Sequence, residues 1–188
     1  KPDCEKLGIR FLPLFYLRDY AHIARPKTDY RYDLMFVGTV HSDRYELLRR
    51  TLEPIEKTGC RCFTYMFFQS RILYWKMKLQ NKSLRNTSPR DFCFVPLAKS
   101  ELIDLYRQSQ AVIDIQHPKQ TGLTMRCIET IGARRKLITT NRHIREYDFF
   151  DPNNILVIDR KHPTVTLEFL RTPYREIPAE IYNRYRID

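Results

Sequence analysis

Short apolar runs alternate with amphipathic segments along most of the chain. The run DLMFVG at 33–38 ends in glycine, and the apolar residues of the next segment, 42–59, recur at helical spacing. This order predicts a strand followed by a helix, and it repeats towards the carboxyl end. The predicted strands are 33–38, 61–68, 92–97, 111–115, 136–140 and 154–159, and the predicted helices are 42–59, 70–84, 100–109, 123–133 and 142–150.

Strands that alternate with helices indicate βαβ units and a parallel sheet. The strands are nearly continuous apolar runs, as expected where helices cover both faces of a sheet. We therefore expect an α/β fold in which a parallel sheet of about six strands is flanked by helices. Ligands of such sheets bind beyond the carboxyl ends of the strands, near the point where the strand order reverses. The turns after 33–38 and 111–115 are therefore the segments to inspect for a site.

Composition and charge limit the classes of binding partner but do not select one of them. A chain of 188 residues with 43% hydrophobic residues is long enough for one domain with a real core. Its formal net charge of +11 favours nucleic acid, an anionic membrane surface or a phosphorylated small molecule. The five cysteines are odd in number and most lie in apolar runs, so we interpret them as free thiols. No apolar stretch reaches the length that spans a membrane.

The stretch DIQHPKQTGLTMRCIE at 114–129 carries most of the candidate chemistry. Gly122, Leu123 and Thr124 lie where a helix is predicted to begin, and helix starts present free N–H groups to phosphate. Arg126 in the first turn could reach a diphosphate, and Glu129, one turn further, could accept the hydroxyls of a ribose. Gln116, Gln120 and Thr121 offer further polar groups in the same turn.

Each of these residues also has a purely structural interpretation. The stretch could be a capped helix with a surface pair between Arg126 and Glu129, but its place after a central strand favours a ligand site. His117 could be a catalytic base, a donor to a phosphate or sugar, or a loop histidine held by Pro118, and a ligand contact is favoured over proton transfer. Asp148, Asp151 and Asp159 are too widely spaced to predict a metal site.

The loop GTVHSDR at 38–44 follows the first predicted strand. It has one glycine and matches neither the dinucleotide nor the Walker A pattern, so a phosphate loop and a simple capped turn are equally supported. Gly38, His41, Ser42 and Arg44 are its candidate site residues.

Basic and aromatic residues are mixed in the predicted helix at 70–84 and just beyond it. The segment from Arg71 to Arg90 suits an anionic membrane interface or single-stranded nucleic acid. A helix that packs its apolar side on the sheet and leaves its lysines in water explains the same pattern. We favour that structural interpretation, with peripheral membrane contact second.

The run VIDIQHPKQTGLTMRCIETIGARRKLITTN resembles the donor-binding segment of bacterial glycosyltransferases of capsule and lipopolysaccharide biosynthesis with the GT-B fold. YDLMFVGTVHSDRYELLR and FVPLAKSELIDLYRQSQAVIDIQ resemble the opening and middle segments of the same carboxyl-terminal half, and the likeness covers 32–159. The resemblance implies a Rossmann-like donor domain at 32–160, preceded by a linker or remnant of an amino-terminal domain at 1–31 and followed by a helical tail at 161–188.

The resemblance also implies roles for particular residues. Gly122, Leu123, Thr124 and Arg126 would meet the diphosphate, and Glu129 would hold the ribose. Val95, Pro96 and Leu97 would border the base, whereas Gly38, His41, Ser42 and Arg44 would face the phosphates or the acceptor. Many enzymes of this fold carry a second glutamate eight positions before the one that Glu129 matches, but Thr121 stands there. The sugar of the donor is therefore not predicted.

The expected function is transfer of a hexose from a nucleotide-diphosphate sugar to a lipid-linked or saccharide acceptor. In this chain only His41 and His117 are candidate catalytic bases, and we expect neither a bound metal nor another cofactor. The expected location is the cytoplasm, with contact to the inner face of the cytoplasmic membrane through Arg71–Arg90. The alternatives are a basic α/β module that binds nucleic acid without catalysis, which lacks any recognition signature, and a degenerate glycosyltransferase scaffold.

Overall fold

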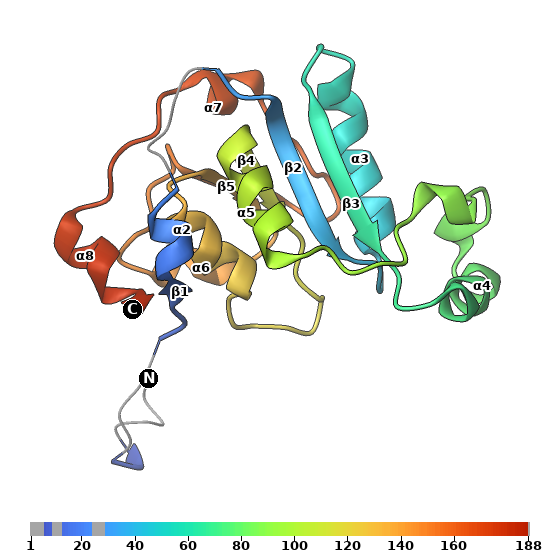
Figure 1. Cartoon of the computed structure of the whole chain (residues 1–188), viewed down its shortest axis with the longest axis horizontal. Coiled ribbons are helices and arrows are strands. Elements are labelled where there is room, and N and C mark those ends of the chain that lie inside the picture. The colour runs from blue at the N-terminus through green and yellow to red at the C-terminus, as the bar shows by residue number, and fades with distance from the viewer. Residues whose placement is uncertain (1–5, 9–12, 24–28, 188) are drawn as a thin grey trace.

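The computed structural model describes residues 6–8, 13–23 and 29–187 of the chain (Figure 1). Within these residues, strands alternate with helices as the sequence predicts. The strands are β1 (Tyr16–Leu17), β2 (Tyr32–Thr39), β3 (Cys62–Phe67), β4 (Ser109–Asp114), β5 (Lys136–Thr139), β6 (Ile155–Val157) and β7 (Arg186–Ile187). The α-helices are α2 (Arg18–Ala21), α3 (Arg44–Glu56), α4 (Arg71–Gln80), α5 (Lys99–Gln108), α6 (Met125–Gly132), α7 (Leu167–Arg171) and α8 (Ala179–Arg184).

The main sheet has five parallel strands in the order β3-β2-β4-β5-β6. This confirms the prediction of a Rossmann-like α/β fold, with one strand fewer than expected. The predicted strand at 92–97 forms only an isolated parallel bridge between Phe67 and Cys93. Pro96 has no N–H group to extend that pairing, and the adjacent Val95 is 72% exposed. The bridge still places this segment beside β3, outside the five-stranded sheet.

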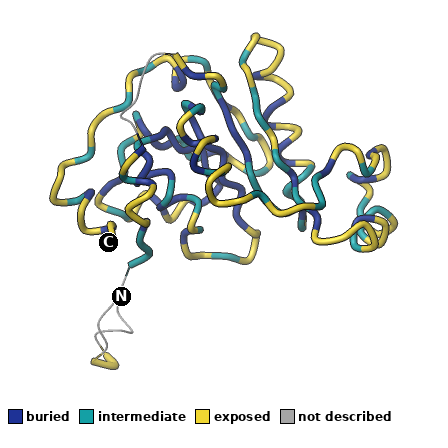
Figure 2. The backbone as a smooth tube through the Cα atoms, viewed as in Figure 1, coloured by how far each residue is buried: buried dark blue, intermediate teal, exposed yellow. Residues whose placement is uncertain are grey.

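Two apolar layers fill the faces of the sheet. On β2, the side chains of Leu34 and Phe36 pack with α3 and α7, whereas Met35 points to the opposite face and packs with α5 and α6. This alternation is the two-residue period of a strand. Figure 2 shows the buried backbone concentrated in the sheet, with exposed backbone on the outer sides of the helices.

Several helix boundaries differ from the prediction for local reasons. Ser100 does not cap α5, because the helix already begins at Lys99; the backbone N–H of Ala98 instead donates to Glu101 at 2.8 Å. The predicted helix at 142–150 is a short 3₁₀ helix, η3 (Arg142–Glu146), whose N-terminus is capped by the side chain of Asn141. The segment 70–84 divides into α4 and the 3₁₀ helix η1 (Lys82–Leu84), with a third such helix, η2, at Pro89–Asp91.

Two short strands from opposite parts of the sequence, β1 and β7, lie together near α6. β1 pairs with β7 in a two-stranded parallel sheet, and Figure 1 shows both near α6 at the same side of the molecule. Tyr16, Tyr20, Tyr182 and Tyr185 are all buried in the apolar layer that contains α6. The described parts of 1–31 and 161–187 therefore share a core with the Rossmann-like sheet, while 1–5, 9–12 and 24–28 of the predicted linker lie outside the described residues.

Candidate ligand site beyond strands β2 and β4

The order of the strands places two loops side by side. β2 and β4 are neighbours, and the chain leaves them for helices on opposite faces of the sheet, α3 on one and α6 on the other. The segment 92–97 bridges to the outer side of β3, so the chain first adds β3 and this segment on one side of β2. It then crosses over and adds β4, β5 and β6 on the other side, so the strand order reverses between β2 and β4. A crevice beyond the carboxyl ends of the strands at such a reversal is where α/β sheets bind ligands. The loops 40–43 and 115–124 lie at this position.

The two candidate histidines, one from each of these loops, lie close together. The rings of His41 and His117 are 5.4 Å apart between centroids, with an angle of 40° between their planes. Burial, with the nearby charge of Arg44, lowers the pKa of His41 to about 4, so that this imidazole is neutral at neutral pH. Its Nδ1 lies 3.0 Å from the hydroxyl of Ser42. Such a low pKa makes His41 a weak base, and a hydrogen-bonding role fits it better.

His117 is exposed, and one of its ring nitrogens is already engaged. Its Nδ1 accepts a hydrogen bond from the backbone N–H of Lys119 at 3.2 Å. In the neutral ring the proton is therefore on Nε2, which makes that atom a donor. This arrangement supports contact with a ligand oxygen rather than removal of a proton.

Arg44 and Gly38 have structural roles in and beside these loops. The guanidinium of Arg44 donates to the carbonyl of Thr39 at 2.7 Å and, through Nε at 2.8 Å, to that of Ile115, which ties the β2 loop to the β4 loop. Its donors are directed at backbone and not at open space. At Gly38, a Cβ would lie 2.8 Å from the ring of Phe36, so packing accounts for this glycine.

The loop before α6 is held by its own polar groups. The side-chain amide of Gln116 donates to the carbonyl of Gln120 at 3.1 Å, and that of Gln120 donates to the carbonyls of Gly122 and Leu123, both at 3.2 Å. The buried side chain of Asn141 donates to Gly122 at 3.0 Å. One buried polar atom of the loop, Oε1 of Gln116, has no hydrogen-bond partner among the described residues.

The start of α6 is built around a buried carboxylate. The hydroxyl of Thr124 caps the helix by accepting from the N–H of Cys127 at 3.3 Å, and donates to Asp114 at 2.8 Å. Asp114 also accepts from Thr139 at 3.2 Å and from the thiol of Cys127. These bonds hold the helix start against the ends of β4 and β5. The N–H of Cys127 is thus engaged, whereas those of Met125 and Arg126, which precede it in the helix, are left for a ligand or water.

Gly122 has a different environment from Gly38. It is exposed, a Cβ built there would meet no atom within 4 Å, and its φ angle is not positive. Neither local conformation nor packing of the protein therefore requires glycine at this position. Close approach of a ligand to the backbone is the remaining physical reason for its small size.

Arg126 and Glu129 lie on one side of α6, as the spacing predicts. Their side chains are only 19% and 18% exposed, and Nη1 of Arg126 is 3.6 Å from Glu129 Oε2. Nη2 donates to the carbonyl of Val37 at the end of β2 at 3.2 Å, but the buried Nη1 has no hydrogen-bond partner within the described chain. Its charge is balanced by Glu129, so what this atom lacks is a hydrogen bond, which an acceptor from a ligand would supply.

Two tyrosines cover this pair. The ring of Tyr20, from α2, lies 5.3 Å from that of Tyr106, from α5, in an edge-to-face arrangement. Burial and the charge of Glu129 raise the pKa of the Tyr20 phenol above its ordinary value. Glu129 is therefore in contact with the amino-terminal segment, which the sequence pattern did not predict.

The three residues expected to border a nucleotide base, Val95, Pro96 and Leu97, differ in burial. Val95 is exposed, and its carbonyl accepts from the hydroxyl of Tyr65 at 2.6 Å. Pro96 is exposed as well, whereas Leu97 packs against the apolar layer that contains α5 and α6. All three follow the bridge beside β3.

Arg160 is a site residue that the sequence reasoning missed. It follows β6, and its guanidinium donates to Asp43 at 2.7 Å and to the carbonyl of Gln116 and the hydroxyl of Thr140, both at 3.1 Å. It thus joins the β2 loop, the β4 loop and the end of β5. Its position directly after a predicted strand was the signal that could have identified it.

No group of three or more metal-ligating side chains occurs in the part of the chain that the structure describes. No helix in that part is long and apolar enough to cross a membrane. Comparison with models of protein families gives no match, and comparison with curated proteins gives no significant match.

Proposed function

We propose that this chain is the donor-binding domain of a glycosyltransferase with the GT-B fold. The donor would be a nucleotide-diphosphate sugar bound in the crevice beyond β2 and β4. The observation that carries the proposal is the buried Nη1 of Arg126 in the first turn of α6, which is paired with Glu129 but has no hydrogen bond among the described residues. A diphosphate supplies the acceptors that this atom lacks. The resemblance of 32–159 to donor domains of polysaccharide synthesis supports the same ligand.

The chemistry expected of these residues is electrostatic. During transfer, negative charge builds on the leaving diphosphate as the bond to the sugar breaks. The free N–H groups at the start of α6 and the guanidinium of Arg126 would stabilise that charge. His117, with its donor at Nε2, would bind a phosphate or sugar oxygen. Glu129 would hold the ribose after exchanging its contact with Tyr20 for the ribose hydroxyls.

Calorimetric titration with the diphosphates of uridine, guanosine, adenosine, cytidine and thymidine tests the proposal. We expect saturable binding of one of them, and at least about a tenfold weaker affinity for Gly122→Val. The branched side chain would occupy the open space in front of the backbone. Because φ at Gly122 is not positive and no atom lies nearby, the thermal midpoint of unfolding should not fall.

Ala98→Val is the matched control, since it places the same branched side chain at the exposed start of another helix, α5. It should bind the nucleotide as the wild type does. Unaltered affinity of Gly122→Val would remove the diphosphate from this loop. If no nucleotide binds and an oligonucleotide binds with steep salt dependence, the nucleic-acid alternative would replace the proposal.

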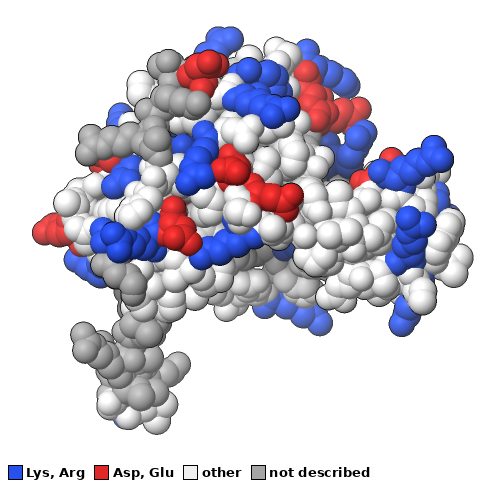
Figure 3. Space-filling model, in the orientation of Figure 1, with Lys and Arg blue, Asp and Glu red and all other residues white. Residues whose placement is uncertain are grey.

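We also propose that α4 contacts an anionic membrane surface, where a lipid-linked acceptor would be found. Ile72, Trp75 and Leu79 form one stripe of this helix and are 82%, 53% and 84% exposed. The expectation that its apolar side packs on the sheet is thus only partly met, because Tyr74 alone is fully buried. In Figures 1 and 3, α4 stands at the right of the view, in a lobe whose surface carries several Lys and Arg side chains. The segment 70–90 contains no acidic residue.

Intrinsic fluorescence can test this contact, because Trp75 is the only tryptophan of the chain. Vesicles of phosphatidylcholine with about 30% phosphatidylserine should shift its emission to the blue, and neutral vesicles should not. Leu79→Glu should abolish the shift, whereas Val95→Ser, at an equally exposed apolar residue outside the helix, should not change it. An unshifted spectrum with anionic vesicles would refute the contact.

A further inference from the structure

A cavity lies at the opposite end of the sheet from the candidate donor site. It encloses about 560 Å³ at the amino ends of β2, β4 and β5, and is closed on one side by α7 and the segment 172–174. This volume is within the range of pockets that hold small organic molecules. The polar side chains that line it include Asp33, Gln110, Arg134, Lys136, Arg171 and Tyr174.

Lys136 is the buried cation of this cavity. It is 2% exposed, and burial lowers the pKa of its ammonium to about 8. The ammonium donates to the hydroxyl of Thr172 at 2.5 Å and to the carbonyl of Phe169. An ammonium has three donors, so the structure accounts for two of them. The charge of the nearby Asp151 offsets the burial of this ammonium only in part, and an anionic ligand would supply a further counter-charge.

A buried hydroxyl lacks a partner in the same place. The phenol oxygen of Tyr174 is buried and has no hydrogen bond to any described residue. Buried hydroxyls normally have at least one partner, so an isolated one needs an explanation. Because Tyr174 lines the cavity, an acceptor bound there would satisfy it.

The remaining charges make the cavity positive. Asp33 is its acidic group, but both of its carboxylate oxygens accept hydrogen bonds from Arg61. The side chain of Arg171, in the last turn of α7, has no hydrogen bond or ion pair with another described residue, so its guanidinium is available to a ligand. The net result is a pocket whose accessible donors favour an acid group.

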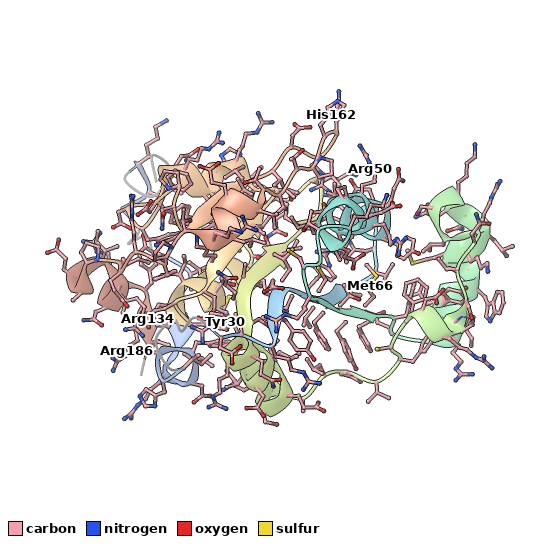
Figure 4. The ribbon with its side chains drawn as sticks, turned by 90° about the horizontal axis from the view of Figure 1, so that it is seen from above. Tyr30, Arg50, Met66, Arg134, His162 and Arg186 are labelled. Carbon is pink, nitrogen blue, oxygen red and sulfur yellow. The ribbon has the colours of Figure 1, made fainter. Side chains whose placement is uncertain are left out.

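Arg134 adds a conformational observation. It follows α6 with φ of +51°, in the left-handed region that glycine adopts at less cost. Hydrogen bonds from Arg134 to Ile131 and from Arg135 to Thr130, both 3.1 Å, close the helix end in this geometry. Its side chain lies over the ring of Tyr182 at 4.1 Å and lines the cavity with Tyr30, beside which it lies in Figure 4. A cationic side chain is thus held at a position where backbone conformation alone favours glycine.

We propose that this cavity is a binding site for a small organic anion, in which a phosphate or carboxylate group reaches Lys136, Arg171 and Tyr174. The body of the ligand would lie against the apolar and aromatic lining supplied by Leu167, Leu170 and Tyr30. The site is independent of the proposed donor site, which lies at the other end of the strands.

Three ring compounds that differ only in their polar group provide the test: phenyl phosphate, benzoate and phenol. Each is titrated into the ¹⁵N-labelled chain and followed by two-dimensional NMR. We expect phenyl phosphate or benzoate to shift the amide signals of Gln110, Lys136 and Thr172 saturably, and phenol to leave them in place. Whichever acid binds more tightly identifies the ligand as a phosphate ester or a carboxylate.

Substitutions of Arg171 and Tyr174 test whether these side chains bind the acid group of the ligand. Arg171→Met and Tyr174→Phe should each weaken binding about two- to tenfold. Tyr174→Phe removes a hydroxyl that has no partner, so it should fold as the wild type does. The matched controls Arg107→Met and Tyr45→Phe, outside the cavity, should bind with unchanged affinity. Equal shifts with phenol, shifts confined to 116–126, no shifts at all, or unaltered affinity of both cavity variants would each overturn the proposal.

Discussion

Replacement of Tyr16 by alanine is expected to lower the free energy of unfolding by about 3–5 kcal/mol, the usual cost of truncating a buried aromatic residue. Tyr16 is fully buried, and its hydroxyl donates to the carbonyl of Tyr182 at 2.7 Å. Its ring fills the space over Gly132, where a Cβ would come within 2.5 Å of it. The substitution would leave a cavity between α6 and both ends of the chain. Denaturation in urea measures the loss directly.

Leu17→Ala is the matched control, because Leu17 is the next residue of the same short strand and is 41% exposed. Its effect should stay within about 0.5 kcal/mol. A small effect of Tyr16→Ala as well would mean that the amino-terminal segment does not share the core of the sheet. In that case the contact of Tyr20 with Glu129 would also come into question, since both tyrosines belong to the same segment.

Arg126→Ala is expected to weaken binding of the preferred nucleoside diphosphate by about ten- to a hundredfold. A hydrogen bond to a charged group contributes about 1.5–3 kcal/mol, and each 1.4 kcal/mol is about a factor of ten in affinity. The alanine variant loses the guanidinium whose Nη1 has no hydrogen bond among the described residues. Titration calorimetry with the nucleotide identified for the wild type measures the change.

A lysine at the same position separates charge from geometry. Arg126→Lys keeps the charge but loses the planar fork of donors, so its affinity should lie between those of the wild type and the alanine variant. Arg107→Ala removes a guanidinium whose one ion pair among the described residues is with the exposed Asp104, and should leave nucleotide affinity unchanged. Because Arg126 also donates to Val37, urea denaturation must show that the variants remain folded. Wild-type affinity in a folded Arg126→Ala would refute the assignment of the diphosphate.

The alternation of elements was available from the sequence because its causes are local. Apolar periodicity predicted β2 and α3, and the Gly122–Thr124 turn predicted the start of α6, where Thr124 is its cap. The position of Glu129 one turn after Arg126 followed from helix geometry alone. These features depend on residues within a few positions of one another, and the structure reproduces them with shifts of only a few residues at the ends.

The partners of the same side chains were decided by contacts between distant segments. Arg44 binds the carbonyl of Ile115, and Arg160 joins the β2 and β4 loops, 117 and 44 positions away from it in the chain. No local pattern reports such pairings, since they exist only after β2 and β4 become neighbours. The predicted strand at 92–97 was reduced to a bridge for the same reason, because sheet pairing depends on the partner strand as well as on propensity.

By itself, the sequence determined the class of fold, the end of the sheet where a ligand is expected and the residue types that could meet a phosphate. Only the tertiary structure decided which of those residues retain a free group. It engaged the donors of Arg44 with backbone carbonyls, left Nη1 of Arg126 without a hydrogen bond among the described residues and buried Lys136 beside a cavity. The physical reason is that burial and hydrogen bonding are properties of packed segments, and these segments are far apart in the chain.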